Sequence, residues 1–191
     1  MQRGGAMVHN PKYSQAGMTW CIESALGLIF KAVKYANRKK SWNTVNDLLA
    51  KECDDSVSRQ QISKMVYSLK KNGYIDLNGS DSVRLTNKAK MRIIDQIADS
   101  QNVDCKYRLV SFDIPELMRE NRNHFRNSIK RMGFKQIQES LWVVDRNVGE
   151  YVEISAKEYG VSEYVAYFVS EASNVDHHIS NVLSGKPKVK D

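Results

Sequence analysis

Residues 58–71 combine side chains and a spacing that suit nucleic-acid recognition. Ile62, Met65, Val66 and Leu69 recur at helical spacing, so the segment is predicted to form an amphipathic helix. The opposite face carries amide, hydroxyl and ammonium groups and no carboxylate, and such groups can pair with bases or phosphates in the major groove. A solvated surface helix is the alternative interpretation. The candidate DNA-binding residues in this segment are Arg59, Gln60, Ser63, Lys64, Tyr67, Lys70 and Lys71.

The segments around this helix predict the rest of a DNA-binding unit. Residues 20–40 and 43–50 have the apolar spacing of two further helices, and Ser58 to Gln61 has the S-x-x-Q form of a capping box. Two alternating segments, 74–77 and 82–85, flank the turn sequence Asn-Gly-Ser-Asp and predict a hairpin. Arg84 on the return strand could reach a phosphate or the minor groove. This order is typical of a winged helix-turn-helix over residues 19–86, after a flexible stretch at 1–18.

The charge of the chain is distributed unevenly. Residues 1–100 hold 16 Lys and Arg against 9 Asp and Glu, whereas residues 101–191 hold 13 of each kind. The whole net charge of +7 therefore belongs to the first half, where a polyanionic partner such as duplex DNA is expected to bind. An ordinary solvated surface is the alternative.

The second half predicts a sheet with two helices. Thr86 is expected to cap a linker helix at 87–98, packed through Ile93, Ile94 and Ile97, in a linker region that runs to residue 104. Beyond it the pattern predicts a strand at 107–113, a helix from Pro115 to about Met132, strands at 134–138 and 141–144, a helix at 149–159 and a strand at 163–169. Leu117, Phe125 and Ile129 are expected to be buried. This is the ferredoxin-like βαββαβ order over 105–172, and it makes the chain an α+β protein. The tail at 173–191 is expected to be mostly flexible, with a short strand or helix possible at 175–182.

Several linked motifs in residues 107–143 resemble a known family. They are Phe-Asp-Ile-Pro-Glu at 112–116, Arg122, Gly133-Phe134, Gln138 and Ser-Leu-Trp at 140–142. They resemble the central domain of PaaX-type transcriptional repressors, which is itself similar to the small dimeric CRISPR-associated endonuclease of the Cas-two type. The resemblance implies a homodimer formed through the ferredoxin-like module, with two winged helices on a palindromic or near-palindromic operator. PaaX-type repressors carry a further C-terminal domain linked to sensing an aryl-CoA effector. The chain is expected to be a short form without it, so its small-molecule effector stays open.

The same resemblance raises a second function. In the endonuclease relatives, the aspartate that ends the first strand lies near its symmetry mate, where two carboxylates could hold a divalent metal for phosphodiester cleavage. Asp113 occupies that position. The alternative is that Asp113 caps or orients the turn into the Pro115 helix. We therefore expect no enzyme and no cofactor, and keep a metal-dependent endonuclease or CRISPR-adaptation accessory as the alternative.

The helix after Pro115 also carries a basic stripe. It is either a second DNA surface or a solvated face partnered by Glu116 and Glu120. The same helix holds His124, which is expected to be a surface residue. The adjacent pair His177-His178 has a poor geometry for binding one metal. The stripe consists of Arg119, Arg122, Arg126, Lys130 and Arg131.

Composition excludes other classes of protein. Cys21, Cys53 and Cys105 are far apart and form no CxxC pair, which argues against a disulfide framework and a zinc site. No apolar run reaches the roughly 18 residues of a membrane span, and the first residues lack the core of a secretory signal. We therefore expect a cytoplasmic protein with no membrane partner.

Overall fold

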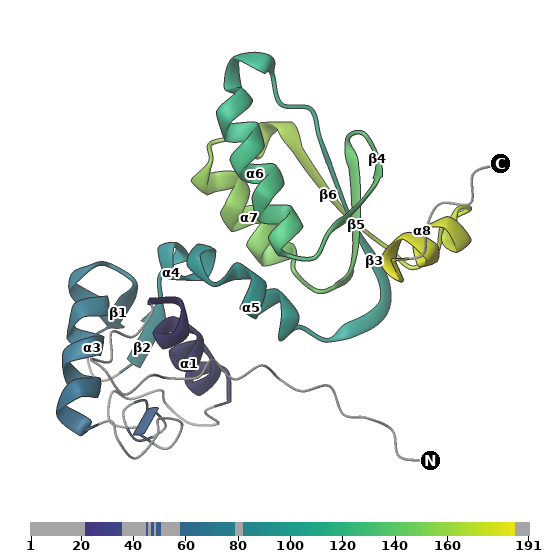
Figure 1. Cartoon of the computed structure of the whole chain (residues 1–191). Coiled ribbons are helices and arrows are strands. Elements are labelled where there is room, and N and C mark those ends of the chain that lie inside the picture. The colour runs from purple at the N-terminus through teal and green to yellow at the C-terminus, as the bar shows by residue number, and fades with distance from the viewer. Residues whose placement is uncertain are drawn as a thin grey trace, which may run out of the picture.

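The computed structural model describes residues 22–35, 45, 47, 49–50, 58–78 and 82–185. Within them the chain is a mixed α and β protein with two antiparallel sheets. The expected flexible start at 1–18, most of the expected second helix, the hairpin tip and the end of the tail lie outside the described residues. Figure 1 shows two bodies joined by a pair of short helices. No helix within these ranges has both the length and the apolar run that crossing a membrane requires.

The first body is built on helices and one hairpin. Between α1 and α3, residues 45, 47, 49 and 50 are helical. Strands β1 and β2 pair antiparallel, with Ile75 opposite Leu85. Leu26, Ile62 and Val83 are among the residues that fill a common core. The elements are α1 (Ile22–Tyr35), α3 (Arg59–Lys71), β1 (Ile75–Asn78) and β2 (Ser82–Leu85).

The connector between the two bodies consists of two helices, α4 (Asn87–Arg92) and α5 (Ile94–Asp99). The prediction of one helix at 87–98 was therefore wrong, because the chain breaks at Ile93, whose φ is −115° and ψ is 29°. The expected burial of its three isoleucines is confirmed, since each is fully buried. The connector belongs to two cores at once. Ala89, Ile93 and Ile97 pack in the first core, and Met91, Ile94 and Ala98 pack in the core of the second body.

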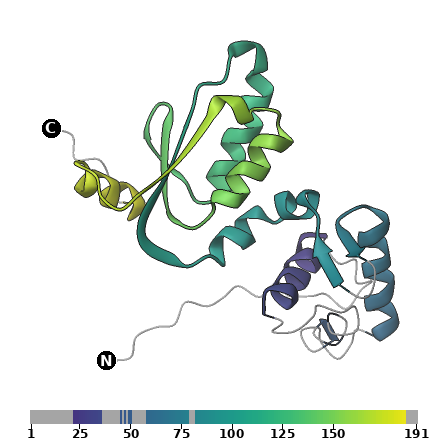
Figure 2. The same cartoon turned by 180° about the vertical axis from the view of Figure 1, so that it is seen from behind.

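The second body has a four-stranded antiparallel sheet in the order β4-β5-β3-β6. Helices α6 and α7 lie on one face of this sheet, as Figures 1 and 2 show from opposite sides. On the other face, Ile179 of α8 packs with Ile137 and Val143. The elements are β3 (Val103–Phe112), η1 (Glu116–Met118), α6 (Arg119–Arg131), β4 (Lys135–Gln138), β5 (Leu141–Arg146), α7 (Gly149–Glu158), η2 (Ser162–Tyr164), β6 (Val165–Ser170) and α8 (Asp176–Leu183).

Alternation along β3 decides which side chains enter the core between sheet and helices. Val110 and Phe112 point into it, and the Phe112 ring meets the Phe125 ring edge-on at a centroid distance of 5.4 Å. Phe125 and Ile129 of α6 are fully buried, as expected. A single aromatic pair of this kind adds about 1 kcal/mol to the burial of its area.

Two details of the second body differ from the sequence prediction. The helix expected from Pro115 begins only at Arg119, because a 3₁₀ turn comes first. Leu117 lies on this turn and is 98% exposed, so its predicted burial was wrong. Of the two possibilities predicted for 175–182, the helix is confirmed: it is α8, and its Ile179 packs on an apolar site of the sheet.

Candidate nucleic-acid interface

Helix α3 begins with the reciprocal cap that its sequence predicted. The Ser58 hydroxyl accepts a hydrogen bond from the Gln61 backbone N–H at 3.2 Å, and the Gln61 side chain accepts one from the Ser58 N–H at 2.7 Å. These bonds satisfy donors that a helix N-terminus otherwise leaves open. The start of α3, and hence the direction of its first residues, is fixed by local sequence alone.

The two faces of α3 divide as the spacing predicted. Ile62, Val66 and Leu69 are buried in the first core. The candidate DNA-binding side chains are all exposed, and Tyr67 is 70% exposed despite its large ring. Among the described residues, Arg59 has one distant ion pair, 3.9 Å from Asp47, and the other candidates on α3 have no side-chain partner. A polyanion could therefore bind this face without first breaking internal bonds.

The end of α3 is tied to the hairpin beside it. Gly73 has a φ of 71°, a left-handed conformation that ends the helix, and its N–H donates to the Lys70 carbonyl. The Thr86 hydroxyl donates to the Gly73 carbonyl at 2.8 Å, and it also accepts the Ala89 N–H at the start of α4. Thr86 thus joins the end of α3, the hairpin and the connector.

Arg84 lies on β2 and is exposed. Its cross-strand neighbour is Asp76, and no side-chain bond from Arg84 to a described residue is formed. Arg84 comes from a different element than the α3 candidates, and α3 contacts β1 of the same hairpin. The Arg84 guanidinium is therefore a point of contact with a ligand that is separate from α3.

Asp113 directly follows β3 and is exposed. Its backbone N–H donates to the Tyr164 carbonyl at 3.1 Å. Asp113 does not cap the following helix, because Pro115 and Met118 occupy the cap positions of η1 and α6 without any side-chain cap bond. That Asp113 orients the turn into Pro115 stays a prediction. In the part of the chain that is described, no three His, Cys, Asp or Glu residues gather closely enough to hold a metal ion. His124 is exposed and stacks on Tyr159.

The basic residues of α6 have several different neighbours. Arg122 donates to Glu116 at 2.8 Å and to the Ile114 carbonyl at 3.3 Å, and this ion pair lowers the pKa of the Glu116 carboxyl. Arg126 and Lys130 lie over the rings of Phe112 and Trp142, at 6.0 and 5.8 Å. Arg119 is 3.7 Å from Glu116 and remains 72% exposed. As a second DNA surface, α6 offers chiefly the exposed Arg119 and Lys130.

Arg131, the last of these residues, holds the connector. Its guanidinium donates to the carbonyls of Met91 and Arg92, at 3.1 and 2.9 Å, and to Asp95 at 2.8 Å. These carbonyls are left open because α4 ends there. This role could not be predicted from the sequence, since the partners lie 36 to 40 residues away and no local pattern links them.

An ion pair in β3 between a buried arginine and an exposed aspartate could not be predicted either. Arg108 is 4% exposed, and its guanidinium makes a two-pronged contact with Asp104. This hydrogen bonding lowers the pKa of Asp104 to about 2. Strand alternation puts Arg108 on the same side as Val110 and Phe112, but the charge of an arginine argues against burial.

Part of the chain matches a known protein family. Residues 100–182 match the family model described as the PaaX protein central Cas2-like domain. The matched range contains the whole motif segment 107–143. Neither a curated protein nor a solved structure matches the chain. The match makes residues 100–182 similar to the central domain of PaaX proteins.

Proposed function

We propose that the chain is a dimeric, sequence-specific DNA-binding transcriptional regulator of the PaaX type, acting as a repressor in the cytoplasm. The observation that carries this proposal is the exposed face of α3. It presents amide, hydroxyl and cationic groups with no carboxylate, while the opposite face is buried. These groups suit base edges and phosphates in a major groove. Binding and release of DNA need no cofactor.

The arrangement of the elements supports this assignment. In the first body, α1, the helical residues near 45–50, α3 and the β1–β2 hairpin follow one another in the order of a winged helix-turn-helix. In the second body, the chain order strand–helix–strand–strand–helix–strand and the sheet order β4-β5-β3-β6 fit a ferredoxin-like domain. We infer that the first body contacts DNA and that the second pairs two copies.

Strand β6 supports pairing through the second body. It is an edge strand within the described residues, and its six residues include no charge and no proline. Phe168 and Val169 are 52% and 54% exposed. The opposite edge, β4, carries Lys135 and an irregular register, and α8 packs beside it. Edges without such protection are open to pairing with another chain, and an uncharged strand meets its own copy without repulsion.

DNA binding can be measured by fluorescence anisotropy with a duplex taken from upstream of the chain's own reading frame, against a scrambled duplex. We expect a preference for the first duplex and weaker binding to both duplexes by Lys64→Ala and Lys71→Ala. If each lysine contacts one phosphate, each loss should reduce the slope of log K against log salt by about 0.9. Lys135→Ala, on β4, is the matched control. Equal affinity of all three variants and the wild type would overturn the assignment of α3.

The alternative is a metal-dependent endonuclease, and one observation favours it. Asp113 is exposed at the end of β3 and has no side-chain bond to any described residue, so its carboxylate is available. A labelled duplex should be incubated with the protein and Mg²⁺ or Mn²⁺, beside Asp113→Ala. Cleavage that the substitution abolishes would replace the repressor proposal. A duplex that stays intact but is retarded in a gel would exclude the nuclease alternative.

A further inference from the structure

The hydrogen bonds at the end of β3 show how its backbone groups are divided between the two neighbouring strands. The Phe112 N–H donates to the carbonyl of Ser140, which directly precedes β5, at 3.3 Å. The next N–H along the chain, that of Asp113, donates to the Tyr164 carbonyl beside β6 at 3.1 Å. Residues of an antiparallel strand bond alternately to the neighbour on one side and to the neighbour on the other. Phe112 therefore bonds toward β5, and Asp113 bonds toward β6.

The same alternation determines which backbone groups of β6 are free. Phe112 lies opposite Val165, and because Phe112 bonds toward β5, the N–H and the carbonyl of Val165 point away from β3. Tyr167 and Val169 follow at intervals of two residues and point the same way. Outside the β3–β6 pair, none of these residues makes a backbone hydrogen bond to a described residue. The outer edge of β6 therefore presents the N–H and the carbonyl of each of them.

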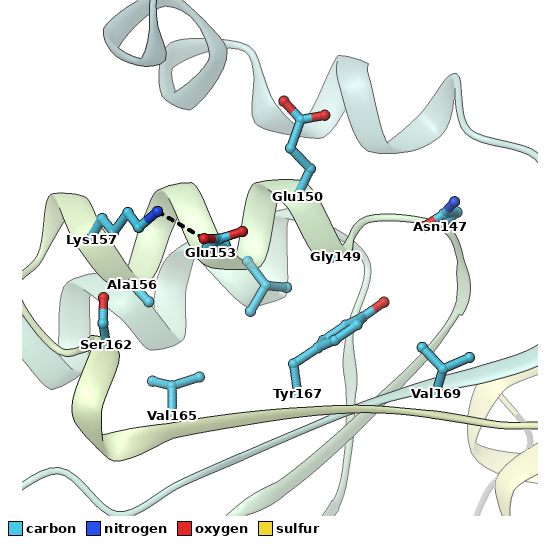
Figure 3. Close-up of a pocket in the computed structure, with 11 residues that line it drawn as sticks. Asn147, Gly149, Glu150, Glu153, Ala156, Lys157, Ser162, Val165, Tyr167 and Val169 are labelled. Carbon is cyan, nitrogen blue, oxygen red and sulfur yellow. Dashed lines mark hydrogen bonds and ion pairs between the residues drawn. The ribbon is translucent and has the colours of Figure 1, made fainter.

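The side chains of β6 alternate between the two faces of the sheet. Figure 3 shows Val165, Tyr167 and Val169 rising toward α7. Ala166 and Phe168 lie on the opposite face, and both are exposed. Among the described residues, the apolar cluster beneath α8 on that face contains residues of β3, β4 and β5 but none of β6. The face of β6 that carries Phe168 is therefore uncovered.

One symmetric register uses all the free backbone groups of β6. When a second β6 runs antiparallel with Tyr167 opposite its own copy, Val165 lies opposite the second copy's Val169. Every free N–H then meets a free carbonyl across the symmetry axis. A shift of two residues in one direction places Val169 opposite Glu163, which lies outside β6. A shift in the other direction places Val165 opposite Glu171, which also lies outside it.

The side chains on the uncovered face fit the same register. Phe168, the largest side chain of β6 on this face, lies opposite the second copy's Ala166, the smallest. The two Phe168 residues are then diagonal neighbours, roughly 7–8 Å apart, a distance that aromatic side chains can bridge. No residue of β6 is charged, so the pair brings no like charges together. Pairing therefore covers the ring of each copy with side chains of the other.

We infer that two copies of the chain join their β6 strands antiparallel about Tyr167, so that one continuous sheet runs through both copies. This inference rests on the proposed pairing through the second body and adds the register of the two strands. In this register the second copy's Val169 lies beside Val165 on the face that carries α7. The groove of about 610 Å³ between α7 and β6 is lined by Val165 and Val169, so in the pair it borders the second copy.

The register can be tested by disulfide cross-linking of the full-length protein, after Cys21, Cys53 and Cys105 have been replaced by serine. Ala166→Cys and Phe168→Cys are prepared as separate proteins. In the inferred register these two positions face each other with Cα atoms about 4.5 Å apart, within the ~4.4–6.8 Å that a disulfide spans. In either protein alone the two cysteines are diagonal neighbours roughly 7–8 Å apart, which is too far. A mixture, allowed to exchange before oxidation, should therefore form a cross-linked dimer that neither protein forms alone.

The other results would each point to a different arrangement. Cross-linking of Ala166→Cys alone or of Phe168→Cys alone, at the level of the mixture, would show a shifted register and overturn the inference. A dimer in analytical ultracentrifugation that no combination cross-links would place the contact outside β6 and overturn it as well. A wild-type protein that stays monomeric would also remove the proposed pairing, while duplex binding reports separately on α3. Phe168→Cys mixed with Glu139→Cys, between β4 and β5 at the opposite edge, measures cross-linking by random collision.

Amide hydrogen exchange gives a second test on the unsubstituted protein. Dilution that separates the copies should speed exchange at Val165, Tyr167 and Val169, whose N–H groups bond to the second copy. Exchange at Ala166 and Phe168 should stay slow, because these N–H groups bond to β3. A change on dilution that does not alternate along β6 would overturn edge-to-edge pairing.

Discussion

The orientation of α3, the candidate DNA-binding helix, depends most directly on Ser58, which caps its N-terminus. Ser58→Ala removes the hydroxyl that accepts the Gln61 N–H. The free energy of unfolding should fall by about 1 kcal/mol, the usual cost of losing such a cap. Urea denaturation followed by circular dichroism measures this change. Ser180→Ala, at an exposed position of α8, should leave stability within error, and an equal loss in both variants would show that the cap contributes nothing.

The pair Asp104–Arg108 should make stability depend on acid. The pKa of Asp104 is lowered from 3.8 to about 2 because its carboxylate accepts hydrogen bonds from Arg108. A carboxyl whose pKa is lower in the folded state stabilises the fold above its unfolded pKa and loses this contribution as pH falls through its folded pKa. The contribution should therefore be complete above about pH 4 and disappear toward pH 2.

Asp104→Asn tests this expectation. The variant should melt at a lower temperature than the wild type at pH 7, since the buried Arg108 loses its ionic partner. The difference should shrink between pH 4 and pH 2. Asp113→Asn removes a carboxylate that has no side-chain bond to a described residue, and it should melt like the wild type. A difference for Asp104→Asn that is the same at every pH would contradict the assignment.

At the scale of elements, local signals predicted some features and not others. The capping box at Ser58, the apolar period of Ile62, Val66 and Leu69, and the stop at Gly73 all act within a few residues, and α3 has the predicted form. The break at Ile93 could not be found in this way. It depends on two cores that bury different residues of the connector and on an arginine from α6 that binds the freed carbonyls.

In the candidate nucleic-acid interface, too, features set by local sequence could be predicted and features set by distant elements could not. Exposure of the α3 candidates could be predicted because amphipathic spacing determines which side chains face outward. The separate uses of Arg122, Arg126 and Arg131 could not, since their neighbours come from other elements. Leu117 was wrongly predicted to be buried because the 3₁₀ turn before α6 shifts its position out of the helical period.

Arg131 should stabilise the break between α4 and α5. Arg131→Lys keeps the positive charge but loses the planar fork whose two terminal nitrogens reach the carbonyls and Asp95. The free energy of unfolding should fall by about 1 kcal/mol, given partial solvent exposure, and amide hydrogen exchange at 91–95 should become faster. The matched control is Arg119→Lys, whose guanidinium is 72% exposed and 3.7 Å from its partner. Unchanged exchange at 91–95 in Arg131→Lys would show that the break persists without this contact.

For the molecule as a whole, the exposed apolar surface at β6 predicts association of two copies. Phe168→Lys places a charge on this strand, and in a symmetric pair the two charges would lie close together. We expect the dissociation constant of the dimer to rise at least about tenfold, corresponding to a loss of 1.4 kcal/mol, when measured by analytical ultracentrifugation. As a control, Leu117→Lys changes a leucine that is 98% exposed on η1, outside β6. Dimers of equal stability in both variants would place the pairing surface elsewhere.

The connector has a consequence for how the chain can be divided. The family match begins at residue 100, but Met91, Ile94 and Ala98 belong to the core of the matched body. A fragment that starts at residue 100 would expose the apolar surface that these three side chains cover, and one that ends at residue 86 would leave the first core without Ala89, Ile93 and Ile97. Helices α4 and α5 thus contribute side chains to both cores. Unfolding of either body should therefore destabilise the other body. The chain should therefore unfold in a single cooperative transition, although the family match covers only the part that begins at residue 100.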